Sequence, residues 1–194
     1  MRQLLKVRTA HLHAALDEAI AIDSLLRDAP DPSAAYRRLL QQLMPAVAAQ
    51  EVAMAVFAFD LEAMGLAPAR RLVKRHWLAR DLTAAGSLTV DVPQRISIND
   101  VFEAIGHLYV AEGATMGGRH VVRLMERHRA SLGHLPNAYF SAYASATGTM
   151  WREFIGVLET MTPSAQERER VVEGACRAFD LYLGQFERRY DRAS

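Results

Sequence analysis

Apolar residues recur along the chain at intervals of three and four, and alternation of apolar and polar residues is nearly absent. Such spacing places apolar side chains on one face of a helix, so it predicts an all-α protein. The first predicted helix ends near Asp28, and its apolar positions are Leu4, Leu5, Leu12, Leu16 and Ile20.

Glycines, prolines and polar turn residues divide the rest of the chain into further helices. At the turn 29–33, Asp31 or Ser33 can cap the next helix, which Pro45 can kink. Residues 86–99 are the least helical part, where the short run 88–90 and Pro93 favour a loop. We expect six or seven helices in one domain, 1–194, and those after the first are 36–56, 69–85, 98–129, 138–161 and 165–191. The last begins with a capping box of Ser164 and Glu167.

Composition narrows the class of protein. With 51% hydrophobic residues, 23% charged residues and a formal net charge of +1, the 194-residue chain is an ordinary globular domain. It lacks the basic excess of a nucleic-acid-binding protein. Its one cysteine, Cys176, excludes an internal disulfide, and neither a secretory signal nor a membrane span is apparent. We therefore expect a soluble cytoplasmic protein with no membrane or nucleic-acid partner.

Three glycines, Gly113, Gly117 and Gly118, lie inside the predicted helix 98–129. Each costs about 1 kcal/mol relative to alanine in a helix interior. Either the helix bends here, or something flat lies against a helix surface without side chains. The alternative is simple packing, because the spacing of Gly113 and Gly117 also allows two helices to approach closely. Taken alone, this segment favours packing.

His13 and Asp17 are four residues apart, hence on one face of the first predicted helix. A carboxylate at this distance can bind one imidazole nitrogen and leave the other free to ligate a metal. Lys6 lies two turns away on roughly the same face and could pair with an anionic group. The alternative is an ordinary surface histidine, which this segment alone favours.

Together the two segments resemble the heme oxygenases. The pattern Thr9-x-x-x-His13-x-x-x-Asp17 precedes Tyr109-Val-x-Glu-Gly-x-x-x-Gly-Gly, and the resemblance spans residues 4–190. It is strongest to the bacterial branch that supplies biliverdin to bacteriophytochromes. Similar stretches are Arg70-Arg71, 77–82 (Trp-Leu-Ala-Arg-Asp-Leu), 150–154 (Met-Trp-Arg-Glu-Phe) and the aromatic final helix.

The resemblance implies an all-α heme-oxygenase-like fold, with heme between the first helix and a Gly-kinked distal helix. It makes His13 the proximal iron ligand and Asp17 the group that orients it. The catalytic backbone over the heme face is then Gly113, Gly117 and Gly118. Tyr109 and Met116 would line the pocket, and Lys6 and Arg152 would lie near the heme propionates.

The implied reaction converts heme, as both substrate and cofactor, with O₂ into biliverdin, Fe²⁺ and CO. Electrons would come from ferredoxin or an NAD(P)H-dependent reductase, and a bacteriophytochrome could accept the biliverdin, unless the purpose is iron release. One departure is Ala114, where relatives carry aspartate or serine and this chain has no side-chain hydrogen bond. Because of Ala114, a non-catalytic heme carrier or sensor on the same fold is an alternative function. A third alternative is a helical scaffold without a cofactor.

Other polar residues suggest less. His107 follows Glu103 by four residues, but the two Glu-x-x-His motifs of a di-metal site are absent. Cys176 is interpreted as a small buried hydrophobe. The cluster of Arg70, Arg71, Lys74, Arg75 and Arg80 is interpreted as a solvated helix face that could also meet an acidic electron donor. The remaining histidines are expected at the surface: His11, His76, His120, His128 and His134.

Overall fold

The computed structural model describes residues 1–87 and 94–187. Within these ranges every regular element is a helix, which confirms the predicted all-α class. The predicted loop at 88–90 and Pro93, and the predicted end of the last helix near 191, lie outside the described residues. The elements are α1 (Arg2–Arg8), α2 (Ala10–Ile20), α3 (Ile22–Arg27), α4 (Pro32–Ala55), α5 (Ala58–Ala63), α6 (Pro68–Arg71), α7 (Lys74–Ala84), α8 (Val101–Arg127), α9 (Arg129–Leu132), η1 (Ala144–Ala146), α10 (Thr147–Thr160) and α11 (Ala165–Glu187).

The first predicted helix is in fact three helices, so the prediction of one was wrong. The chain breaks at Thr9, and again at Ala21, whose backbone is left-handed with φ 44°. The reason is tertiary: α1 and α2 pack against α11, whereas α3 packs against α4 and α8. One straight helix could not make all of these contacts.

The helix predicted over 138–161 is correct only in its second half, because α10 begins at Thr147. Residues 138–146 form turns and η1 instead. The backbone amides of Ala138 and Tyr139 both donate to the Asp81 carboxylate on α7, at 2.8 Å each. These long-range hydrogen bonds replace helical ones at the predicted start. The predicted helix 69–85 is likewise divided, into α6 and α7.

Two predictions that depend on local sequence are confirmed. Oδ1 of Asp31 accepts a hydrogen bond from the backbone of Ala34 at 2.9 Å and caps α4, which contains Pro45. Ser164 and Glu167 form the capping box of α11, with reciprocal hydrogen bonds of 2.7 and 3.2 Å. Caps involve neighbours in sequence, so the sequence is sufficient to predict them.

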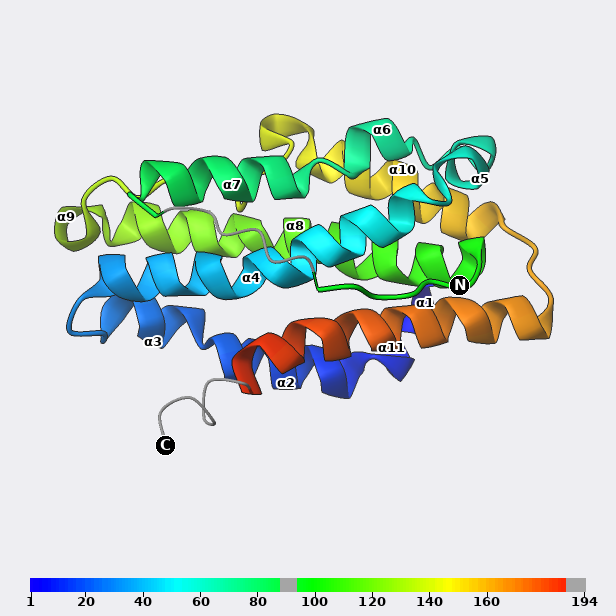
Figure 1. Ribbon diagram of the computed structural model, residues 1–194, viewed down its shortest axis with the longest axis horizontal. Helices are drawn as coiled ribbons and strands as arrows, with labels where there is room; N and C mark the ends of the chain where they lie inside the picture. The colour runs from blue at the N-terminus through cyan, green and yellow to red at the C-terminus, as the bar shows by residue number, and fades with distance from the viewer. Residues whose placement is uncertain (88–93, 188–194) are drawn as a thin grey trace.

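The longest described helix, α8, runs along the long axis of the molecule, with α7 above it and α11 and α2 below (Figure 1). It crosses α11 closely at two glycines. A Cβ at Gly106 would overlap the carbonyl oxygen of Val171, and a Cβ at Gly174 would overlap that of Glu103. The two glycines therefore let the backbones of α8 and α11 touch. Within the described ranges, no helix has the length and apolar character needed to cross a membrane.

Candidate active site

One face of α8 is covered at its beginning and open further along. Gly113 and Gly117 lie seven and eleven positions after Gly106. Because each residue turns an α-helix by about 100°, all three glycines share this face. At Gly106 the backbone of α11 fills the space beside the helix. A Cβ added at Gly113 or Gly117 would meet nothing within 4 Å. The structure thus leaves bare backbone facing open space at these two glycines.

Gly118 has a different environment from its two companions. A Cβ there would lie 2.5 Å from the carbonyl oxygen of Phe140, which belongs to the non-helical segment before η1. Real Cβ atoms do not approach oxygen so closely, so this position requires glycine for packing. The helix itself continues through all three glycines without interruption.

His13 lies on α2 with its side chain 65% exposed. Its Nδ1 atom lies 2.9 Å from Oδ2 of Asp17, as the spacing predicted, which leaves Nε2 available as a metal ligand. The ring also contacts Phe179 of α11, with centroids 5.9 Å apart. Helix α11 packs against α2 and also against α8 at Gly106. His13 on α2 and the open glycine face of α8 therefore both lie next to α11.

Aromatic side chains lie beside the glycine face on α8 and α10. The ring of Tyr109 is half-buried and its centroid lies 6.0 Å from that of Trp151. Burial raises the pKa of the Tyr109 hydroxyl, and the nearby charge of Arg2 opposes this shift. Met116 is half-buried on the same helix.

The two predicted propionate cations are both exposed. Lys6 lies on α1, and Arg152 lies on α10, where its Nη2 donates to the Thr149 hydroxyl at 3.0 Å. Helices α1 and α10 pack against each other, so the two side chains come from neighbouring elements.

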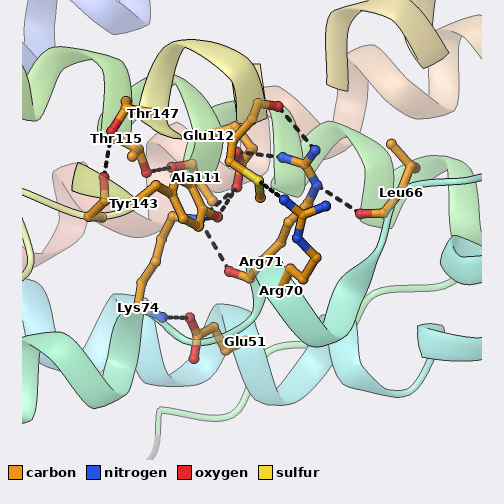
Figure 2. Close-up of polar contacts among 12 residues, drawn as sticks. Glu51, Leu66, Arg70, Arg71, Lys74, Ala111, Glu112, Thr115, Tyr143 and Thr147 are labelled. Atoms are coloured by element: carbon orange, nitrogen blue, oxygen red, sulfur yellow. Dashed lines mark hydrogen bonds and ion pairs between the residues drawn. The ribbon is translucent and has the colours of Figure 1, made fainter. Parts of the chain in front are cut away.

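On the other side of α8, a buried ionic cluster lies directly before the glycines (Figure 2). Glu112 is 1% exposed, and its carboxylate accepts hydrogen bonds from Arg71 and Lys74 at 2.7 Å each. It also accepts one from the Tyr143 hydroxyl at 2.8 Å. Burial and the charge of Glu112 raise the pKa of Tyr143 well above its usual range. This hydroxyl therefore stays protonated and acts as a donor to the carboxylate.

The prediction of a solvated basic face was wrong for two of its members. Arg71 and Lys74 are 1% and 4% exposed, because Glu112 neutralises them inside the protein. Glu51 binds the same region: its carboxylate accepts from the backbone amides of Lys74 and Arg75, and burial raises its pKa. Arg70 and Arg80 are exposed, as predicted.

Comparison with known proteins decides the family. The family model described as heme oxygenase matches residues 1–188. The chain belongs to the heme oxygenase family. A heme oxygenase of Xanthomonas campestris pv. campestris (strain 8004) is 36% identical over 70 residues, which make up 36% of this chain and 41% of that protein. The aligned part thus spans less than half of that relative's length.

Two solved structures share the heme oxygenase fold. The NO- and CO-bound heme oxygenase from Neisseria meningitidis has a TM-score of 0.76 at 18% identity, covering 96% of this chain and 89% of its own. The heme oxygenase from Leptospira interrogans also has a TM-score of 0.76, at 16% identity, with 95% and 97% covered. At such identities the likeness establishes the fold alone.

Ala114, where the family resemblance leads us to expect a polar residue, is exposed. Ala114 carries no polar group, and the neighbouring Thr115 hydroxyl donates to the carbonyl of Ala111 at 3.1 Å. The Thr115 hydroxyl is therefore bound to its own helix. Neither side chain supplies the polar group expected here from the family resemblance.

The remaining polar candidates have other partners. Glu103 binds Arg177 and Asn99, and His107 lies near Gln50, so the two side chains do not converge on a common point. Cys176 is half-buried rather than buried. Of the histidines predicted at the surface, His128 is half-buried and the exposed ones are His11, His76, His120 and His134.

Proposed function

We propose that this chain is a catalytic heme oxygenase that holds heme between α2 and the open face of α8. It uses O₂ and reductant to convert heme into biliverdin, Fe²⁺ and CO. The observation that carries the proposal is the pair formed by His13, with its orienting Asp17, and a glycine face at which added Cβ atoms would meet only space. A simple packing role for Gly113 and Gly117 would instead require a neighbour in contact with them.

On α2, His13 provides Nε2 as the iron ligand. Asp17 accepts a hydrogen bond from Nδ1–H and holds the ring in one orientation, which leaves Nε2 free to bind the iron. Phe179 supports the ring from α11. Bound heme supplies the iron that binds and activates O₂.

On α8, bare backbone at Gly113 and Gly117 permits close approach to the heme plane. Side chains at these positions would occupy the space that the reacting oxygen needs near the edge of the macrocycle. Ala114 offers no side-chain proton, so the proton source in this proposal is ordered water held by backbone carbonyls. Tyr109 and Met116 form its apolar wall, and Lys6 and Arg152 pair with the propionates.

Ferredoxin or an NAD(P)H-dependent reductase supplies the electrons in this proposal, in a cytoplasmic setting. An acidic donor fits the exposed side chain of Arg80 and that of Arg70, which also pairs with Glu153 at 3.6 Å. The biliverdin passes to a bacteriophytochrome, or the reaction serves iron release.

The test is a hemin titration followed by reduction in air with catalase present, since free peroxide degrades heme without an enzyme. We expect a stoichiometric Soret band that is lost on reduction while biliverdin absorbance grows. The exposed alanine at position 114 favours one other function, a heme carrier or sensor. A stable histidine-ligated spectrum with no biliverdin would select the carrier, and absence of a Soret band would contradict both functions.

A further inference from the structure

Residues 136–144, which we call the brace, cross α8 on the side away from its open glycine face. They are held to the rest of the molecule independently of α8. The Tyr36 hydroxyl of α4 donates to the carbonyl of Pro136 at 2.9 Å. The Asp81 carboxylate of α7 accepts the backbone amides of Ala138 and Tyr139. The brace is therefore fixed to α4 and α7 before it reaches α8.

The brace meets α8 at both ends of its glycine stretch. Beyond the stretch, the carbonyl of Phe140 lies against the backbone of Gly118. Just before the stretch, the Tyr143 hydroxyl donates to Glu112 at 2.8 Å. Gly113 and Gly117 lie between these two attachments. Since glycine allows a helix more backbone freedom than any other residue, the attachments hold the part of α8 that most needs support.

The backbone of the brace is strained where it contacts Glu112. Tyr143 and Ala144 have φ values of 60° and 47°, in the left-handed region that non-glycine residues rarely adopt. Such conformations persist where the surrounding contacts over-determine them. Here two hydrogen bonds hold the Tyr143 side chain. Its hydroxyl donates to Glu112, and Nζ of Lys74 donates to the same hydroxyl at 3.1 Å.

We propose that Glu112 is a positioning residue for the distal wall of the heme pocket. It acts through its bonds to Tyr143 of the brace and to Arg71 and Lys74. These bonds fix the rotation of α8 about its own axis and its distance from the heme pocket. As a result, Gly113 and Gly117 present their backbone to the heme. This inference rests on the proposed function.

A purely structural ion cluster would behave differently. Its loss would destabilise the whole fold without a preference for the glycine stretch. Glu103 provides the matched comparison, because it lies on the same helix, is 1% exposed and is paired with Arg177. The variants Glu112→Gln and Glu103→Gln each remove one buried charge from α8, and only the first lies at the glycines.

The first measurement is amide hydrogen exchange of the hemin-free protein, resolved along α8. We expect Glu112→Gln to speed exchange over residues 109–118 by about tenfold more than over 101–108. Glu103→Gln should give the reverse order. Tyr143→Phe keeps both ion pairs and removes only the hydroxyl, so it tests the brace even if Glu112→Gln does not fold. It should change exchange in the same stretch by a smaller factor.

The second measurement is the hemin dissociation constant with the Soret spectrum of the ferric complex. Glu112→Gln should weaken binding about tenfold or more and alter the spectrum, whereas Glu103→Gln should change neither. Equal acceleration of exchange along α8 in both variants, or unchanged exchange in Tyr143→Phe, would overturn the proposal. If the wild-type protein binds no hemin, the proposed function fails, while the exchange pattern still decides the role of the brace.

Discussion

At position 117 an added methyl group would enter open space, whereas at position 118 it would press against the carbonyl oxygen of Phe140. This contrast gives a prediction for two neighbouring substitutions. Gly117→Ala should stabilise the hemin-free protein by up to about 1 kcal/mol, because alanine is the better helix former. It should nevertheless lower hemin affinity, since the methyl group occupies space reserved for the heme. Thermal unfolding and hemin titration measure the two effects.

Gly118→Ala is the control, and it should destabilise the fold by about 1–3 kcal/mol through overpacking. If Gly117→Ala raised stability and left hemin affinity untouched, the open glycine face would not be the heme wall.

The charged residues show what a sequence can and cannot reveal at this scale. His13 and Asp17 are one helical turn apart, and their pairing follows from spacing. The burial of Arg71 and Lys74 depends on Glu112, which lies 38 to 41 positions further along the chain. The local sequence of α6 and α7 therefore predicts, wrongly for these two residues, a solvent-exposed basic face. An acid flanked by Ala111 and Gly113 on a largely apolar helix was the available signal.

At the scale of elements, the crossing of α8 and α11 determines where the open face begins. Gly106→Ala should lower the free energy of unfolding by about 1–3 kcal/mol, because its Cβ would overlap the backbone of α11. Denaturant unfolding measures this loss. Gly156→Ala is a matched control, since a Cβ there meets nothing within 4 Å. Similar stability changes in the two variants would contradict the close crossing.

Helix ends that depend on neighbouring residues were predictable from the sequence, and those that depend on distant residues were not. The start of α4 at Asp31 and that of α11 at Ser164 were predictable, because each cap bonds to residues three positions away. The break at Ala21 and the absence of an α-helix over residues 138–146 were not predictable. They arise from packing of α3 on α4 and α8, and from hydrogen bonds to Asp81 on α7. These partners are far away in sequence.

For the whole molecule, stability should depend on pH through one buried histidine. Burial, aided by the charge of Arg177, lowers the pKa of His107 from 6.5 to about 4. The folded protein therefore favours the neutral ring. Its contribution is fully present above about pH 6.5 and is lost as the pH falls through 4. At 1.36 kcal/mol per pKa unit this amounts to roughly 3 kcal/mol.

The variant His107→Gln should flatten the stability profile between pH 6.5 and 4 relative to the wild type. His134→Gln, at an exposed position, should leave the profile unchanged. Denaturant unfolding at several pH values measures both, and the buried carboxyl groups cancel in each comparison. Parallel wild-type and His107→Gln profiles would show that His107 titrates normally in the folded state.

The most direct measurement of the central claim is the absorption spectrum of the ferric hemin complex of His13→Ala beside that of the wild type. The His13 side chain is 65% exposed, so the variant should fold normally. The account predicts that loss of the imidazole changes the iron spectrum and abolishes conversion of heme to biliverdin. A His13→Ala protein that binds hemin with an unchanged spectrum and still produces biliverdin would contradict it.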